Sequence, residues 1–149
     1  MRALETLRKV RVKIKVIIFL ILLTSCNVKS ACFPDLIDYS LEGELKRSSS
    51  VIIATPISKT WVDDEEDPGF YAGAIYQLDI HEVLIQKNNK IIELWDSNDS
   101  GRFAPEIGKR YLMFVQLNSD GKYVVSYCGN SGLYQDKTEL INKLKRKIN

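Results

Sequence analysis

The sequence contains one histidine and three cysteines in 149 residues, and this scarcity restricts its chemistry. His81 is the only imidazole that a hydrolytic triad could use as its base. Zinc sites take three or four ligands from His, Cys and carboxylates, and the chain has no Cys-x-x-Cys pair to begin one. No glycine-rich phosphate-binding loop follows any expected strand. We therefore expect no enzyme activity, no catalytic residue, no metal and no cofactor.

A long hydrophobic run is also lacking. The apolar run at residues 16–23 is short, whereas a helix that crosses a bilayer needs about 20 apolar residues. Six Lys/Arg precede this run in the first fifteen positions, and small residues follow it. A basic segment, a short apolar run and small residues together are typical of a secretory signal peptide. We expect residues 1–25 to be this signal, and residues 26–149 to form the exported domain.

Residues 23–26, Leu-Thr-Ser-Cys, resemble the lipobox of bacterial lipoproteins. The resemblance implies that Cys26 carries a lipid, with acyl chains such as palmitate, and becomes the mature N-terminus. The protein would then be anchored to a membrane of the cell envelope, facing the periplasm or the exterior. Ordinary cleavage without lipid is the alternative. A cut after Ser30 fits the small-residue rule, whereas a cut after Ala31 places Lys29 where a small side chain is favoured.

The exported part is slightly acidic and has the length of one domain. Of the chain's 21 basic and 19 acidic residues, residues 1–25 hold six and one, so the rest carries 15 against 18 and a net charge of −3. This balance is not that of a nucleic-acid-binding domain. The basic residues near the end, at 143 and 145–147, are interpreted as the solvated face of a terminal helix.

Cysteine usage predicts one disulfide. Once Cys26 is assigned to the lipid, Cys32 and Cys128 are the remaining thiols, and exported proteins reside in oxidising compartments. A metal site or a catalytic thiol is the alternative for these two residues, and neither has supporting ligands in the sequence.

The pattern of apolar residues predicts an all-β domain with a terminal helix. Strands are expected at residues 51–58, 74–86, 90–95, 110–116 and 122–128, and a helix capped by Thr138 in the last fifteen residues. Pro56 predicts an edge or a bulge, and the change of parity at His81 predicts a second bulge, with His81 exposed or paired across strands. The acidic run at 63–67 is expected to be a solvated hairpin tip, and weak Ca²⁺ binding there is the alternative.

Five strands joined by hairpins, with no alternation of strand and helix, predict a small closed antiparallel barrel. Its landmarks are similar to the netrin-type OB-fold of the tissue inhibitors of metalloproteinases and their bacterial relatives. They are Ala31-Cys32, residues 50–54, 76–80, 83–84 and 107–114, and residues 126–130, Ser-Tyr-Cys-Gly-Asn. The resemblance implies a five-stranded OB-like barrel with a C-terminal helix.

The chain departs from this family at two cysteines. Relatives commonly begin Cys-x-Cys and carry another cysteine before the Gly-x-x-Tyr-Leu block, whereas here Pro34 and Ser100-Gly101 stand at those places. In the animal inhibitors, a free N-terminal cysteine chelates the protease zinc. With Cys26 acylated, Cys32 would lie inside the chain and could not present that group. The resemblance therefore supports the fold and not inhibition.

Two functions follow from these patterns. The first is a membrane-anchored, non-enzymatic binding module, with a protein or peptide partner at a surface formed by Trp61, Phe70, Trp95 and Phe103. The alternative is an inhibitor of secreted metalloproteases, acting through the N-terminal cysteine segment, and it requires cleavage next to Cys32.

Overall fold

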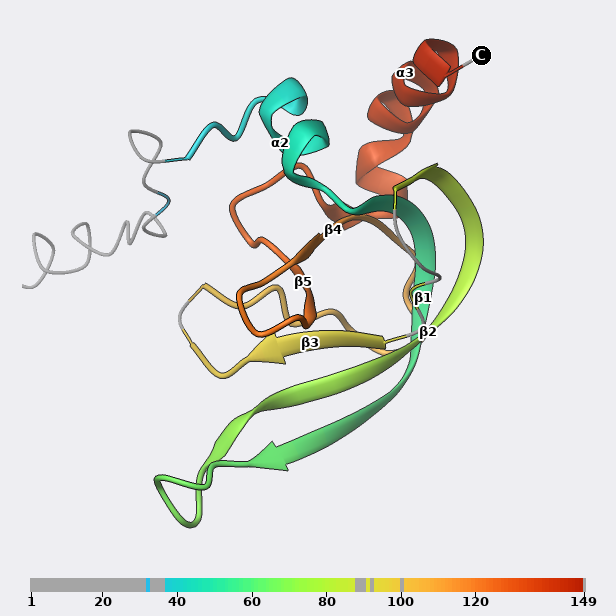
Figure 1. Ribbon diagram of the computed structural model, residues 1–149. Helices are drawn as coiled ribbons and strands as arrows, with labels where there is room; N and C mark the ends of the chain where they lie inside the picture. The colour runs from blue at the N-terminus through green and yellow to red at the C-terminus, as the bar shows by residue number, and fades with distance from the viewer. Residues whose placement is uncertain (1–31, 33–36, 88–90, 92, 100, 149) are drawn as a thin grey trace, which may run out of the picture. The chain divides into compact units, whose positions relative to one another are not determined.

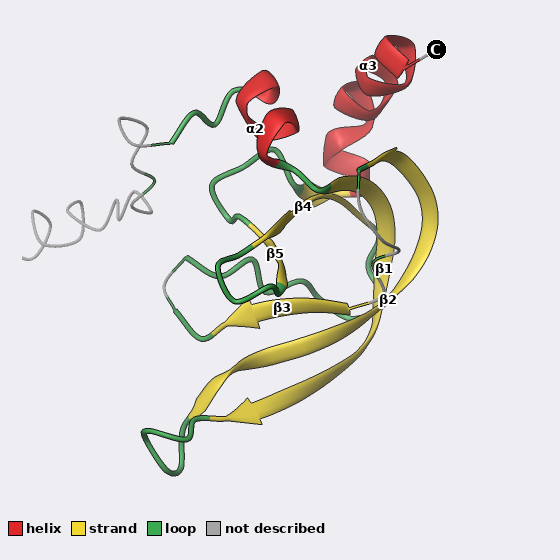
Figure 2. Ribbon diagram, in the orientation of Figure 1, coloured by secondary structure: helices red, strands yellow, loops and turns green. Residues whose placement is uncertain are grey.

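A six-stranded antiparallel sheet forms the centre of the structure (Figures 1 and 2). The computed structural model describes residues 32, 37–87, 91, 93–99 and 101–148, and residues 32–149 belong to one compact unit. The strands are β1 (Ser50–Asp63), β2 (Tyr71–Gln86), β3 (Glu93–Ser97), β4 (Tyr111–Leu117), β5 (Tyr123–Val125) and β6 (Gly132–Leu133). Their order is β3-β2-β1-β4-β5, and β6 also pairs with β4.

The sheet is open, so the prediction of a closed barrel is wrong. In the part of the chain that the structure describes, β3 pairs with β2 alone and β5 pairs with β4 alone. The fifth strand was expected to reach residue 128 but ends at Val125. After it the chain turns towards Cys128, which is bonded to Cys32. Strand β5 is three residues long, and within the described chain no ladder of hydrogen bonds joins it to β3.

The two expected irregularities in the β1–β2 pair are confirmed. Pro56 pairs with Leu78 and Ser58 with Gln77, so one residue is extra at Ile57. On β2, Glu82 and Ile80 face consecutive residues of β1, which leaves His81 as the extra residue. Such bulges bend a strand and increase its twist. Both long strands therefore curve strongly, as Figure 1 shows.

Two helices and a 3₁₀ turn accompany the sheet: α2 (Leu41–Arg47), η1 (Tyr134–Lys137) and α3 (Thr138–Ile148). The Ser40 hydroxyl caps α2 by accepting a hydrogen bond from the Gly43 N–H at 3.1 Å. The terminal helix is confirmed, but Thr138 does not cap it. Thr138 already has helical dihedrals after η1, and its hydroxyl donates to the carbonyls of Tyr134 and Gln135.

Both faces of the sheet bury apolar side chains, because successive residues of a strand point to opposite faces. On β1, Ile52 and Ala54 belong to one core, and Val51 and Ile53 belong to the other. The first core also contains Ala74, Tyr76, Leu78, Ile91, Leu94, Tyr111, Met113, Val115 and Val125. The second core contains Leu84, Leu112, Phe114, Ile141 and Leu144, with the α2 residues Leu41 and Leu45 packed against it. Both helices therefore contribute to the same core.

A buried glutamate joins α2 to the segment after β5. Glu44 has no exposed surface, and its Oε2 accepts hydrogen bonds from the backbone N–H of Asn130 at 2.6 Å and from its Nδ2 at 2.7 Å. Its Oε1 has no hydrogen-bond partner among the described residues. Gly129 lies directly against that oxygen, where a Cβ atom would overlap it. A larger side chain at position 129 would therefore have to displace the Glu44 carboxylate from its place against Asn130.

Candidate binding surface

The β1–β2 hairpin extends beyond the rest of the sheet. Strand β4 pairs with β1 only as far as Ala54, and among the described residues the outermost backbone hydrogen bond on that side runs from Gly108 N–H to the Pro56 carbonyl, at 2.8 Å. Beyond it, residues 57–63 of β1 pair with β2 alone within the described chain. We call residues 57–77 the arm; its tip lies at the lower left of Figure 1.

Three exposed aromatic residues lie on the arm. Trp61, Phe70 and Tyr71 expose 45%, 62% and 46% of their surface, and none of them belongs to either core. The Trp61 and Tyr71 rings stack, with centroids 5.0 Å apart and planes 26° from parallel. Clustered exposed aromatic side chains are typical of interaction surfaces. We call these three residues the arm cluster.

Lys59 is folded onto this cluster. Its Nζ lies 3.6 Å from the centroid of the Trp61 ring and 5.2 Å from that of Tyr76, so the ammonium group makes cation–π contacts. Lys59 was not among the surface residues predicted from the sequence. The alternation of residues 59 and 61 on one face of the strand is the signal that could have identified Lys59.

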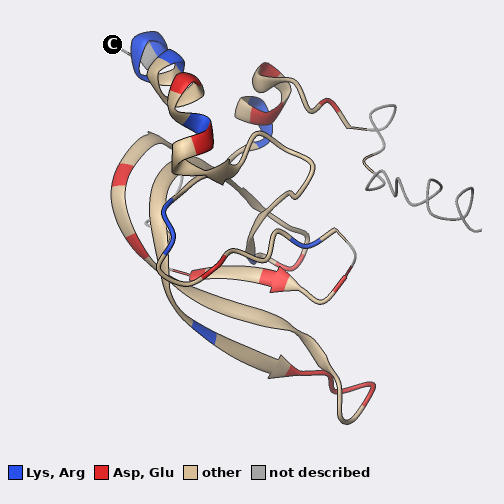
Figure 3. Ribbon diagram, turned by 180° about the vertical axis from the view of Figure 1, so that it is seen from behind, with Lys and Arg blue, Asp and Glu red and all other residues tan. Residues whose placement is uncertain are grey.

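The tip of the arm is strongly acidic (Figure 3). Residues 63–67 are Asp-Asp-Glu-Glu-Asp, and no salt bridge in the described structure involves any of them. The turn is closed by hydrogen bonds from Asp64 N–H to the Phe70 carbonyl and from Phe70 N–H to the Asp67 carbonyl. The hairpin tip is thus confirmed. No group of three His, Cys, Asp or Glu residues in the described chain is arranged to hold a metal ion.

Trp95 lies apart from the arm cluster, at the gap between β3 and β5. The Lys122 Nζ sits 3.8 Å from the centroid of its ring. A cavity of about 340 Å³ opens there, lined by Val62, Ile75, Glu93, Trp95, Gly121, Lys122 and Tyr123. Gly73 allows this arrangement, because a Cβ at that position would lie 2.7 Å from the indole ring. We call this cavity the seam cleft.

Phe103 is partly buried, although the predicted binding surface included it. It packs against the first core and makes an edge contact with Tyr111, with centroids 5.5 Å apart. The backbone N–H groups of Phe103 and Ala104 both donate to Asp96 Oδ1, at 3.0 and 3.2 Å. Ala104 has a φ of 45°, a left-handed conformation that is unusual for alanine. Asp96 thus holds a strained turn.

Burial of Asp96, which is only 7% exposed, raises the pKa of its carboxyl above the ordinary value, although the two N–H groups act against this. An acid whose pKa is raised in the folded state makes folding less favourable as the pH rises through that raised pKa. We therefore expect Asp96→Asn, whose Oδ1 can accept the same two hydrogen bonds, to be at least as stable as wild type at pH 7. Urea unfolding from pH 3 to 7 checks this. The wild type should lose stability relative to the variant as the pH rises, and a variant that is less stable at pH 7 would contradict the expectation.

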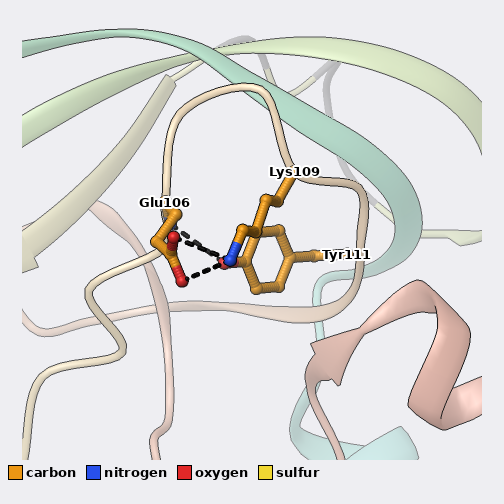
Figure 4. A network of polar contacts seen from close by, with 3 residues as sticks. All are labelled: Glu106, Lys109 and Tyr111. Carbon is orange, nitrogen blue, oxygen red and sulfur yellow. Dashed lines mark hydrogen bonds and ion pairs between the residues drawn. The ribbon is translucent and has the colours of Figure 1, made fainter.

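The loop before β4 is fixed by a small polar network (Figure 4). The Glu106 N–H donates to the Tyr111 hydroxyl at 2.9 Å, and the Lys109 Nζ donates to Glu106 Oε1 at 2.9 Å. The hydrogen bond and the charge of Glu106 raise the pKa of Lys109 above its ordinary value. Because Tyr111 is buried in the first core, this network connects the loop to the sheet beside the arm.

His81 makes the expected cross-strand contact. Its Nε2 lies 2.7 Å from the Thr55 hydroxyl, and its Nδ1 lies 3.9 Å from Asp79 Oδ2. The Asp79 side chain is 61% exposed and the His81 side chain 29% exposed. The Thr55 hydroxyl and the His81 imidazole thus form an exposed cross-strand hydrogen bond, and the Asp79 carboxylate lies beside the imidazole.

The predicted disulfide between Cys32 and Cys128 is confirmed, with Cα atoms 5.7 Å apart. Cys26 lies outside the described residues. No protein-family model matches the chain, and a comparison with curated proteins finds no significant match. Within the described residues, no helix is long and apolar enough to cross a membrane.

Proposed function

We propose that this chain is an exported lipoprotein, anchored through Cys26, that acts as a non-enzymatic binding module and contacts a protein partner through the arm. The observation that carries the proposal is the arm cluster. Trp61, Phe70 and Tyr71 all stay exposed on this one hairpin, outside the two apolar cores that bury many of the domain's other large apolar side chains. Aromatic residues in such positions are enriched where proteins meet their partners.

The finer fold that we propose is a partly open OB-like sheet of the netrin type. The strand order β3-β2-β1-β4-β5 supports it, since it places the third and fifth strands at the two free edges. The contact of Lys122 with Trp95 brings those edges together without pairing them. OB-folds bind ligands on the face of their second and third strands and the adjoining loops, which in this chain correspond to the arm and the seam cleft.

The anchor completes the proposal, because it fixes the domain at a surface. A diacylglyceryl group and an additional acyl chain hold a protein on a membrane stably, whereas a single chain is marginal. The domain beyond Cys26 is acidic and polar, so it would extend from the membrane into the aqueous phase. A binding surface at the end of a long hairpin is well suited to contact a neighbouring envelope protein.

The experiment places a photo-crosslinking aromatic amino acid at position 70 of the full chain in intact cells. Tyr127, which is 52% exposed, provides the matched control position. We expect a discrete adduct from position 70 that Trp61→Ala abolishes and that position 127 does not give. The same adducts from both positions, or adducts unaffected by Trp61→Ala, would overturn the binding function.

The same cells test the anchor. Metabolic labelling with a fatty-acid analogue should mark the wild type but not Cys26→Ser, and Cys26→Ser should leave the membrane fraction. Equal labelling of both proteins would contradict the anchor. An N-terminal sequence that begins at Cys32 would instead favour the metalloprotease inhibitor, because a free cysteine amine would then be available.

A further inference from the structure

The arm carries a long unpaired strand edge. Residues 57–63 of β1 have β2 on one side and no strand on the other within the described chain. In an extended strand, the N–H and C=O groups of alternate residues point to opposite sides. One set of these groups in residues 57–63 therefore faces outwards and is available to a further strand.

The usual protections of an edge strand are missing here. Proteins block such edges with proline, bulges or projecting lysines. On this edge, Pro56 and the bulge at Ile57 lie at its inner end, where they leave the outer residues uncovered. The only lysine on the edge, Lys59, has its ammonium group folded over the Trp61 ring instead of projecting. The edge from Ser58 to Val62 is thus open to strand addition.

The charge of the arm indicates what kind of strand would bind. Residues 63–67 carry five carboxylates, and none of them makes a salt bridge in the described structure. Like charges at the same tip repel each other, and a cationic partner would relieve that repulsion. A strand that pairs with residues 57–63 would end beside these carboxylates and beside the exposed Phe70 ring.

From these observations we infer that the arm binds an extended, basic segment of its partner by β-strand addition along residues 57–63. Main-chain hydrogen bonds to the free edge would supply the affinity. Lysine or arginine side chains near one end would contact residues 63–67. The Trp61 ring would pack beside the added strand, because cross-strand neighbours on one face lie about 5 Å apart. The inference rests on the proposed binding function and specifies the chemistry of the partner.

The test measures site-resolved amide hydrogen exchange of the full processed protein in detergent. The probe is a synthetic hexapeptide of alternating Thr and Val with a Lys at each end, at millimolar concentration. When this peptide is present, we expect alternate amides within residues 57–63 to exchange at about one tenth of their rate without peptide, or more slowly still. One control peptide has alternate amides N-methylated, and a second has Glu in place of Lys. Neither should protect these amides, since the first cannot form the hydrogen bonds and the second has the wrong charge.

Matched variants separate charge from structure. Glu65→Gln combined with Glu66→Gln removes two tip charges, and we expect several-fold weaker binding of the lysine peptide. Glu42→Gln combined with Glu139→Gln removes two exposed charges elsewhere and should leave peptide binding unchanged. Equal effects of the two pairs would overturn the charge assignment.

Three results would overturn strand addition. These are no protection of residues 57–63 by the lysine peptide, equal protection by the N-methylated peptide, and a dimeric mass without peptide, which would show that a second copy occupies the edge. If position 70 still gives its Trp61-dependent adduct, the binding function stands and only strand addition fails. If that adduct is also absent, both proposals fail.

Discussion

Replacing both Cys32 and Cys128 by serine should lower the free energy of unfolding by about 4 to 5 kcal/mol. The two cysteines are 96 residues apart in the chain, so their bond closes a loop that contains every strand of the sheet except β6. A cross-link over such a loop removes much of the conformational freedom of the unfolded chain. Since small domains are stable by only about 5 to 15 kcal/mol, we expect the double variant to be marginally folded.

Urea unfolding of the wild type and the double serine variant measures this effect. Cys26→Ser is the matched control, because Cys26 is outside the confirmed bond, and its unfolding midpoint should equal that of the wild type. Reduction of the wild type should bring its stability to the level of the double variant. A loss below about 1 kcal/mol would mean that the unfolded chain gains little freedom when the bond is absent.

Periodicity alone was enough to predict the strands that have one or both faces in a core. Strand β4 was expected at residues 110–116 and occupies Tyr111–Leu117, because all of its apolar residues up to Val115 are buried. The bulge at His81 was also predicted, since an extra residue in one strand shifts the parity of all the residues that follow it. These features depend on local sequence and on burial, which the pattern of apolar residues records directly.

The outer parts of the arm were harder to predict. The first strand was expected to end at residue 58 but continues to Asp63, through residues that are largely exposed. Their extended conformation depends on pairing with β2 rather than on a buried face, and pairing between distant residues leaves no period in the sequence. The open sheet was hard to predict for a similar reason. Whether the sheet closes depends on how many residues of β5 pair with another strand, and that pairing joins residues that are distant in the sequence.

The residues of the predicted binding surface also fall into two groups, those whose exposure agrees with the prediction and those that pack inward. Trp61 and Phe70 were predicted as exposed and are exposed, because they flank an acidic turn. Phe103 packs inward, because Asp96 accepts hydrogen bonds from the turn that carries it. A contact between an acid and two backbone N–H groups several residues away has no signature in a single sequence.

Glu44 is the clearest case of a residue whose importance only the structure reveals. In the sequence it is one of two acids on a short helix, and solvent exposure is the ordinary expectation for both. In the structure Glu42 is exposed, whereas Glu44 is fully buried and receives two hydrogen bonds from Asn130. Removing it would leave the Asn130 backbone N–H without this partner in a place that solvent reaches poorly.

We therefore expect Glu44→Ala to lower the free energy of unfolding by about 2 to 4 kcal/mol, because an unpaired buried donor and a cavity both destabilise the fold. Glu42→Ala, on the same helix, should change it by less than about 0.5 kcal/mol. Urea unfolding of the two variants measures the difference.

A double-mutant cycle then tests whether Glu44 acts through the segment after β5. Gly129→Ala alone should be strongly destabilising, since its Cβ would overlap Glu44 Oε1. In the Glu44→Ala background that overlap is absent. Gly129→Ala should therefore destabilise this variant less than it destabilises the wild type, by a difference of at least about 1 kcal/mol, which is within the range measured for residues in contact. Additive effects would show that the two residues stabilise the fold independently. A positive coupling would show that α2 and the Cys128 segment are held together by this contact in addition to the disulfide.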